Sequence, residues 1–246
     1  MTEFASWKRY WEFSNKIRCD YRYIHDETVK EFFKSLIDTC EERKTILSKG
    51  TVLWRVQLGH DWEDPNEKNN YKNIPIPYPA NRMKPLINGA AEGRINPKGI
   101  PYLYLATDEN TAMAEVRPWV GSVMTIGKFK TTKDLTLIDL TFSYTKPQIL
   151  SSEPEPNTKK EAVWFDIAEA FSIPITNSDN QAEYTPTQVI AELFKANGFD
   201  GIKYRSTLGE GSNIAIFNIE NADLVERFLG EARKITYSFS RVRYVK

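Results

Sequence analysis

The pattern of apolar and polar residues along the 246-residue chain predicts a mixture of helices and strands. Residues 26–43 carry apolar side chains at helical spacing, with Asp26 placed to cap the first turn. The aromatic residues of 7–14 predict a shorter helix before it, so the chain begins with a helical pair. Residues 51–58 alternate as a strand, and Gly50 separates this strand from the helices.

Beyond residue 100 the same patterns predict short strands and two helices. One helix is capped by Thr107 or Asp108 and ends before Pro118; another is capped by Thr185 and ends before Gly198. Strands and helices are mixed without the rhythm of βαβ units, so we predict an α+β fold. The predicted strands cover 101–106, 123–129, 135–141, a hairpin of 201–206 with 213–218, and 235–245.

Two segments lack a regular pattern. In residues 59–99 Asp, Asn and Pro dominate, and the prolines of 74–79 argue against regular strand pairing there. A loop of this length in a compact domain is commonly functional or disordered. Residues 146–160, rich in Pro, Ser, Glu and Lys, are expected to form a surface loop without a domain boundary.

Composition and charge narrow the class of protein. Apolar residues make up 41% of the chain, and 33 basic residues balance 33 acidic ones. The absence of a basic excess or tract argues against a dedicated nucleic-acid binder. No stretch approaches the roughly 20 apolar residues of a membrane span, and the first residues lack a signal core. We therefore expect a cytoplasmic protein that binds neither membranes nor nucleic acid.

Conventional catalytic and metal motifs do not occur. The sequence lacks GxGxxG after a strand, GxxxxGK[ST], HExxH and GxSxG, and its two histidines, His25 and His60, have no motif around them. Cys19 and Cys40 form no CxxC pair and do not complete a zinc site with these histidines. We expect reduced packing thiols and no metal.

Several blocks of the sequence resemble the longer members of the RES family. The family is named after an Arg, a Glu and a Ser, which match Arg55, Glu115 and Ser206. Arg94, Tyr104 and Glu115 also fall at family-like intervals within one gapless segment. The N-terminal helices resemble a segment that precedes many longer RES domains. The matching blocks are LWRVQLG (53–59), NRMKP (81–85), 93–119, 184–206 and NIAIFN (213–218).

The resemblance implies a fold, a reaction and partners. It implies an ADP-ribosyltransferase-like domain over 49–246, preceded by a helical segment over 1–48. It also implies a toxin that consumes NAD by hydrolysis or by phosphorolysis and is held in check by a cognate antitoxin. NAD would be the substrate, with inorganic phosphate as co-substrate of the second reaction, and no further cofactor is required. The segments 1–50 and 59–99, which lengthen this chain relative to compact members, could cap the site, restrict its substrate or form a homo-oligomer interface.

The chemistry of the nicotinamide–ribose bond agrees with such a residue set. Nicotinamide leaves from a cationic pyridinium and needs no proton, whereas most glycosidases need a second carboxylate to supply one. One carboxylate that stabilises an oxocarbenium-like sugar or orients the attacking group is then sufficient. One Glu, several Arg, a Tyr and a Ser, without an essential His, suit this reaction.

Glu115 and Arg55 have the most specific expected roles. Glu115 is the candidate catalytic carboxylate; the alternative is a solvated helix residue paired with Arg117 or Lys128. Arg55 lies mid-strand, where a charge is costly to bury without a partner. It is expected to contact the NAD diphosphate or a phosphate co-substrate in bidentate fashion, unless it lies on the solvated face of an edge strand.

Two further arginines and a tyrosine extend this candidate site. Arg94 and Arg82, from the long loop, would bind anionic groups or else lie on the surface. Tyr104 would stack on nicotinamide or donate its hydroxyl to the ribose, unless it only packs within its strand.

The residues after position 180 are expected to complete the site. Ser206 would hydrogen-bond a ribose hydroxyl or a phosphate, or else cap the hairpin, and no accompanying base suggests a nucleophile. Asn213 would orient the Ser206 loop or contact the ligand. Thr187 and Gln188 lie in a matching block without a clear role.

Two rival functions stay open at the level of sequence. An ADP-ribosyltransferase that modifies a macromolecule would share the first half of the reaction. A non-enzymatic module that binds NAD or a related dinucleotide would need the same pocket without turnover.

Overall fold

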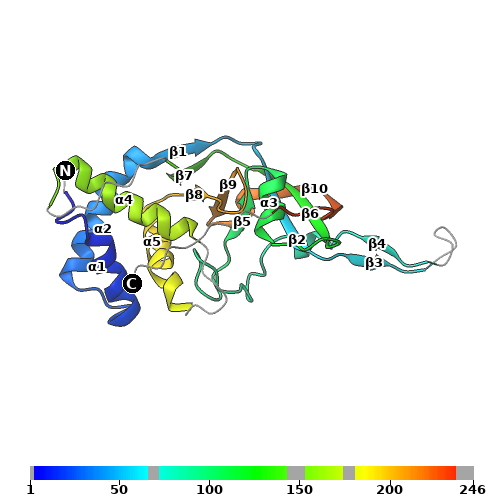
Figure 1. Ribbon diagram of the computed structural model, residues 1–246, viewed down its shortest axis with the longest axis horizontal. Helices are drawn as coiled ribbons and strands as arrows, with labels where there is room; N and C mark the ends of the chain where they lie inside the picture. Colours follow the sequence, from blue (N-terminus) through cyan, green and yellow to red (C-terminus); the bar gives the residue numbers. More distant parts are fainter. Residues whose placement is uncertain (1–2, 66–71, 143–152, 174–180, 237–246) are drawn as a thin grey trace.

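A computed structural model of the chain describes residues 3–65, 72–142, 153–173 and 181–236, and it confirms the predicted α+β class. The described residues form an eight-stranded sheet with the order β1-β7-β8-β9-β5-β2-β6-β10 (Figure 1). Neighbouring strands are antiparallel except β7 and β8, which run parallel. The strands are β1 (Lys44–Leu47), β2 (Val52–Leu58), β5 (Leu103–Ala106), β6 (Val123–Thr131), β7 (Leu135–Leu140), β8 (Gly201–Arg205), β9 (Ser212–Ile216) and β10 (Ala222–Glu231).

Helices pack on the two ends of one sheet face. α4 contacts β7 and β8, and α5 contacts β8. α1 packs on both of these helices, and α3 lies over β2 and β5. Tyr104 and Ala106 are two positions apart on β5 and so share a face. Tyr104 packs against the core of the helical end, and Ala106 belongs to the smaller core under α3. The helices are α1 (Arg9–Cys19), α2 (Glu27–Thr39), α3 (Glu109–Glu115), α4 (Pro156–Ser172) and α5 (Thr185–Ala196).

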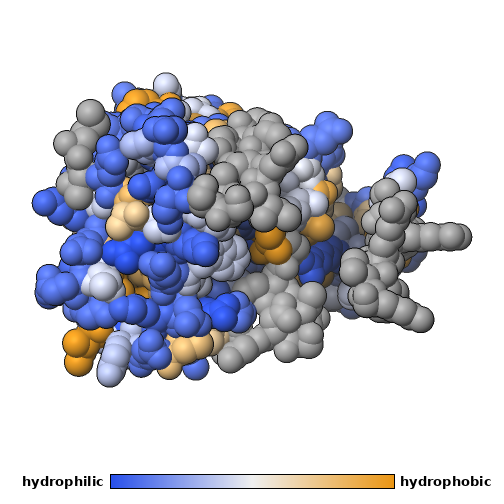
Figure 2. All heavy atoms as spheres, turned by 60° about the vertical axis from the view of Figure 1, so that its left-hand side comes forward, coloured by the Kyte–Doolittle hydropathy of each residue, from blue (hydrophilic) through white to orange (hydrophobic). Residues whose placement is uncertain are grey.

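The N-terminal helices share their core with the sheet. The rings of Phe13 and Phe32 stack at 4.6 Å, and Leu36 is fully buried in the same cluster as residues of β7 and β8. Trp164 of α4 donates its indole N–H to Thr39 Oγ1 of α2 at 3.1 Å. The outward face of this end is largely hydrophilic (Figure 2), as expected when the apolar faces of the helices point inward.

The segment that was predicted to be helical over 1–48 ends in a strand, residues 44–47. They form strand β1, which pairs with β7 along its whole length, rather than belonging to a purely helical segment. The reason is local: a 3-10 turn over Cys40–Arg43 ends α2, and the alternating residues after it can pair with an open sheet edge. The division into two domains itself stays a prediction.

The segment 59–99 is not wholly irregular. Strands β3 (Asp61–Glu63) and β4 (Ile74–Ile76) form a two-stranded ribbon in which Trp62 lies opposite Pro75. This ribbon projects away from the body of the molecule (Figure 1). A two-stranded ribbon has a free edge on each strand, so a proline that donates no hydrogen bond is tolerated there.

Helix α4 and strand β10 were not predicted. Residues 156–160 are the first turns of α4, not part of a surface loop. This helix is buried on several sides, so it lacks the one-sided pattern by which a helix is found. In β10 the register shifts between Leu224 and Glu226, which interrupts the alternation.

The termini of the predicted elements agree in part with the structure. The carboxylates of Asp26 and Asp108 accept hydrogen bonds from Val29 N and Thr111 N and cap α2 and α3 as expected. Thr185, the predicted cap, is instead the first residue of α5.

The remaining sequence expectations concern the chain's end and membranes. Residues 235 and 236 form no strand, and the rest of the strand predicted over 235–245 lies outside the described residues. Within the described ranges, no helix combines the length and apolar character needed to cross a bilayer.

The shared core predicts that the N-terminal helices unfold together with the sheet. Leu36→Ala is expected to lower the free energy of unfolding by about 2–5 kcal/mol, because it leaves a cavity in a fully buried cluster. Urea denaturation followed by circular dichroism and by tryptophan fluorescence should give one coincident transition. Leu86→Ala, at a side chain that is 68% exposed, is the control and should change stability by about 0.5 kcal/mol or less. Two separate transitions in Leu36→Ala would contradict the shared core.

Candidate active site

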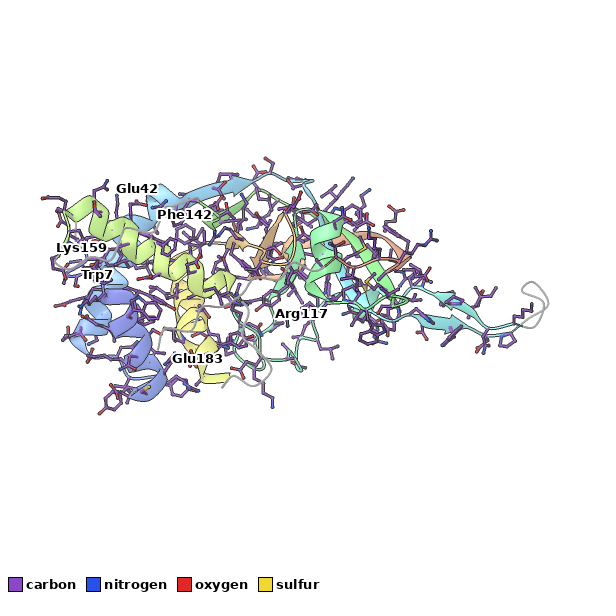
Figure 3. The ribbon with its side chains drawn as sticks, in the orientation of Figure 1. Trp7, Glu42, Arg117, Phe142, Lys159 and Glu183 are labelled. Carbon is purple, nitrogen blue, oxygen red and sulfur yellow. The ribbon has the colours of Figure 1, made fainter. Side chains whose placement is uncertain are left out.

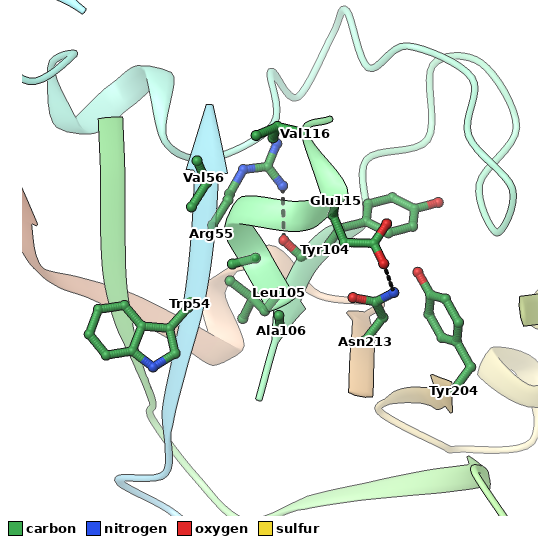
Figure 4. Close-up of a pocket in the computed structure, with 11 residues that line it drawn as sticks. Trp54, Arg55, Val56, Tyr104, Leu105, Ala106, Glu115, Val116, Tyr204 and Asn213 are labelled. Carbon is green, nitrogen blue, oxygen red and sulfur yellow. Dashed lines mark hydrogen bonds between the residues drawn. The ribbon is translucent and has the colours of Figure 1, made fainter. Parts of the chain in front are cut away.

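A pocket of about 250 Å³ lies on the sheet face between α3 and the helical end (Figure 4). The sheet is locally open here, because the described residues of β2 and β5 pair at a single position, Trp54 opposite Ala106. The lining residues come from four strands, from α3 and from the residue that follows α3: Trp54, Arg55, Val56, Tyr104, Leu105, Ala106, Ala112, Glu115, Val116, Tyr204 and Asn213.

Helix α3 ends on Glu115 and brings this carboxylate to the pocket. Asp108 caps its first turn, and Thr111 Oγ1 accepts the N–H of Gly211, which ties the helix to the β8–β9 turn. After the helix, Arg117 adopts a positive φ of 48° and Pro118 prevents continuation. Arg117 is labelled in Figure 3. Both ends of α3 are therefore fixed, and Glu115 is the one carboxylate of this helix that lines the pocket.

Glu115 is fixed through one of its two oxygens. Oε1 accepts hydrogen bonds from Ser206 Oγ and Asn213 Nδ2, each at 2.7 Å. Oε2 accepts none from the part of the chain that the structure describes. Nor does Glu115 form an ion pair with Arg117 or Lys128 among those residues, so the pairing in the alternative is absent, although the side chain is exposed as that alternative expected.

Ser206 contacts Glu115 and also caps the turn of the hairpin, which was the alternative role expected for it. Its oxygen also accepts the backbone N–H groups of Leu208 at 3.1 Å and Gly209 at 3.0 Å. A hydroxyl has one proton, and here that proton points to the carboxylate. Ser206 is therefore placed to orient the carboxylate of Glu115.

Arg55 is a half-buried cation without a carboxylate partner among the described residues. Its strand lies between β5 and β6, so the alternative of an edge strand is wrong. The guanidinium donates through Nη1 to the carbonyl of Tyr104 at 3.1 Å, while Nε is buried without a partner. Burial lowers the pKa of Arg55 from its usual value. A charge held in this way is expensive unless an anion arrives in the pocket.

Tyr104 presents its ring to the pocket and commits its hydroxyl to the protein. The hydroxyl donates to Asn96 Oδ1 at 2.7 Å and accepts the backbone N–H of Ile95 at 3.1 Å. Burial raises the pKa of Tyr104 to about 12, against smaller opposing effects of these hydrogen bonds. The expectation that this hydroxyl reaches a ribose therefore does not fit the structure, whereas ring stacking stays open.

A buried amide network fixes the loop that carries Arg94. Asn96 Nδ2 donates to the carbonyls of Ala91 and Ile100, each at 2.9 Å, and Gln188 Nε2 donates to Gly93 O at 2.8 Å. Thr187 Oγ1 donates to the Arg94 carbonyl at 2.6 Å. Asn96, Thr187 and Gln188 are all buried. Thr187 and Gln188, which had no clear role in the sequence, thus join α5 to this loop.

The three predicted arginines are not brought to one place. Arg94 lies beside the pocket rather than in its lining, and its guanidinium donates to the carbonyl of Phe171. Its charge nevertheless acts to lower the pKa of Tyr104 and of Tyr204. Arg82 is exposed, lies outside the pocket lining, and stacks on Tyr78 at 3.6 Å from the ring centroid.

Tyr204 was missed at the level of sequence. It lies on β8 directly opposite Asn213, so the two side chains share a face of the sheet. The alternation of β8 could have found it, because Ile202 and Tyr204 point into the core while Lys203 and Arg205 do not. Among the described residues, no group of three or more His, Cys, Asp or Glu could hold a metal ion.

The close packing of the amide network around Gly93 leads to a prediction about stability. A Cβ added there would lie 2.6 Å from Asn96 Oδ1 and 2.8 Å from the Tyr104 hydroxyl. Gly93→Ala should therefore cost about 1–3 kcal/mol of unfolding free energy, measured by urea denaturation. Gly89→Ala is the matched control, because its Cβ would meet only Leu86 at an ordinary 3.7 Å. Equal stability of the two variants would show that the loop is not fixed as described.

Comparison with known proteins gives one distant structural likeness and one family. The chain resembles a structure described as the MbcT–MbcA toxin–antitoxin complex of M. tuberculosis, with 16% identity and a TM-score of 0.43. The likeness covers 80% of this chain and 92% of the other, and a TM-score this low carries no argument about function. No protein with a curated description matches the sequence.

The family assignment rests on the sequence. The sequence model of the RES domain matches residues 52–239, which span every strand that lines the pocket and α3. That range also contains Arg55, Glu115 and Ser206. The chain belongs to the RES domain family.

Proposed function

We propose that this chain is an enzyme that cleaves the nicotinamide–ribose bond of NAD, with water or inorganic phosphate as acceptor. The observation that carries the proposal is the state of Glu115. One carboxylate oxygen is held by Ser206 and Asn213, and the other accepts no hydrogen bond from the described residues. The same pocket contains Arg55, which has no carboxylate partner in that part of the chain.

The reaction needs few groups from the protein. The carbon–nitrogen bond between ribose and nicotinamide breaks, its electron pair passes to the pyridinium nitrogen, and neutral nicotinamide leaves. The sugar becomes oxocarbenium-like, and the carboxylate of Glu115 stabilises this positive charge. In hydrolysis a lone pair of water attacks the anomeric carbon, and one proton of that water passes to solvent. In phosphorolysis an anionic oxygen of phosphate attacks the same carbon, and no proton has to leave.

The uncompensated charge of Arg55 supports an anionic substrate. A guanidinium binds phosphate oxygens through parallel hydrogen bonds. NAD carries a diphosphate, and phosphorolysis brings a second anion. Arg94, at the side of the pocket, is the next cation that such a ligand would meet.

Product analysis separates the acceptors and the rival functions. NAD labelled in its ADP-ribose part is incubated with the protein, with and without inorganic phosphate. Free ADP-ribose supports hydrolysis, and the 1-phosphate formed only with phosphate supports phosphorolysis. Label transferred to protein or nucleic acid would favour an ADP-ribosyltransferase. Tight NAD binding without any product would favour a non-enzymatic binding module.

The cellular role that we propose is that of a toxin paired with a cognate antitoxin. It follows from the resemblance to NAD-consuming RES toxins, and the cytoplasm, where the NAD pool lies, is then the place of action. Induced expression should lower cellular NAD, and a variant that lacks the free carboxylate should not.

Glu115→Gln tests the assignment of the carboxylate. It keeps the size of the side chain but removes the charge that stabilises the sugar cation, so NAD consumption should fall at least about 100-fold. Glu109→Gln, in the first turn of the same helix and outside the pocket lining, is the control and should keep the wild-type rate. Wild-type turnover by Glu115→Gln would refute the role of Glu115.

Arg55→Met tests whether Arg55 is kept for an anion rather than for stability. Removal of a half-buried charge without a counter-ion should leave the melting temperature unchanged or raise it. NAD turnover should nevertheless fall about 10-fold or more, as expected when a charged hydrogen bond is lost. Inorganic pyrophosphate should raise the melting temperature of the wild type but not that of Arg55→Met. A strong loss of stability in Arg55→Met would contradict this account.

A further inference from the structure

Three tyrosines near the pocket differ in what their hydroxyl groups contact. Tyr104 donates to Asn96 and accepts from Ile95, so its hydroxyl is saturated by the protein. The hydroxyl of Tyr102 is buried without a partner, and Tyr102 lies outside the pocket lining. Tyr204 lines the pocket, and its hydroxyl makes no hydrogen bond to any residue that the structure describes. Of the three, Tyr204 thus combines a place in the pocket with a hydroxyl that has no hydrogen-bond partner in the described ranges.

The position of Tyr204 follows from the pairing of β8 with β9. Tyr204 lies opposite Asn213, and Asn213 donates to Glu115 Oε1. Directly opposed side chains of an antiparallel pair are neighbours on one face. In Figure 4 the Tyr204 ring stands beside Asn213 with its hydroxyl directed toward Glu115. The hydroxyl and the free carboxylate oxygen therefore face the same part of the pocket.

The hydroxyl acts as a hydrogen-bond donor at neutral pH. Burial raises the pKa of Tyr204 well above its usual value, and the nearby Tyr104 and Glu115 add to this effect. The charge of Arg94 opposes it without reversing it. A protonated phenol can donate one hydrogen bond and accept another.

Tyr204 and Glu115 together offer the hydrogen-bond donor and the acceptor that a sugar hydroxyl needs. Such a hydroxyl donates one hydrogen bond and accepts others. With respect to the described residues, Glu115 Oε2 is an acceptor without a donor, and the Tyr204 hydroxyl is a donor without an acceptor. The hydroxyl of a ribose can satisfy both through a single oxygen, which the aromatic ring of nicotinamide and an unprotonated phosphate oxygen cannot do.

We propose that Tyr204 is a substrate-contacting residue whose hydroxyl donates a hydrogen bond to a hydroxyl of the ribose attached to nicotinamide. This assignment rests on the proposed function, since it places that ribose beside Glu115. No proton is transferred; the contact binds and orients the sugar.

Tyr204→Phe tests the contact by equilibrium binding. Calorimetry is performed with ADP-ribose, which carries the distal ribose, and with ADP, which does not. Loss of one neutral hydrogen bond should weaken ADP-ribose binding about three- to tenfold and leave ADP binding unchanged. In turnover, kcat/KM for NAD should fall by at least as much.

Tyr102→Phe is the matched control, because it removes an unpartnered hydroxyl outside the pocket lining. It should change neither affinity. The melting temperatures of both variants check that they are folded.

The outcomes separate this inference from the proposed function. Wild-type affinity of Tyr204→Phe for ADP-ribose would overturn the role of Tyr204 even if the wild type consumes NAD. Equal affinity of the wild type for ADP-ribose and ADP would also overturn it. A selective loss of ADP-ribose binding in Tyr204→Phe, with no NAD cleavage by the wild type, would support Tyr204 and refute the proposed function.

Discussion

The structure of the site depends on the two hydrogen bonds that Glu115 Oε1 accepts. They join the end of α3 to the β8–β9 hairpin, whose two strands are almost a hundred residues further along the chain. Both donors are neutral, so the carboxylate keeps its negative charge uncancelled while its position is fixed. A neighbouring lysine or arginine would have fixed it equally well but would have neutralised the charge. A site that stabilises a cation requires a negative charge that is fixed in place but not neutralised by a neighbouring cation.

The same principle governs Arg55 on the opposite wall. It is held by a backbone carbonyl, again a neutral partner, where β2 and β5 separate. Two opposite charges thus share one pocket, and no ion pair joins them among the described residues. The folded protein bears the cost of desolvating the guanidinium of Arg55, a cost that a bound anion would relieve.

Much of this was visible in the sequence, and the exceptions have physical causes. The helix of 26–43, the cap at Asp108 and the β8–β9 hairpin follow from local patterns, and the gapless block that contains Tyr104 and Glu115 led to the pocket. α4 escaped because it is buried on several sides, and β10 because its register shifts. The sequence could not show that the Tyr104 hydroxyl is occupied by Asn96 or that Arg82 stacks on Tyr78, since both depend on how the 59–99 segment folds back. Tyr204 acquires its significance only from Asn213 beside it.

Strand β1 has a consequence for any shortened form of the protein. It covers the outer edge of β7, whose other side is paired with β8. A chain that began at residue 49 would retain the RES-matched region but would present β7, with its run of leucine and isoleucine, as a bare edge. Such edges recruit strands from other molecules. Self-association of a truncated protein would therefore reflect an exposed backbone ladder and would carry no information about the oligomeric state of the full chain.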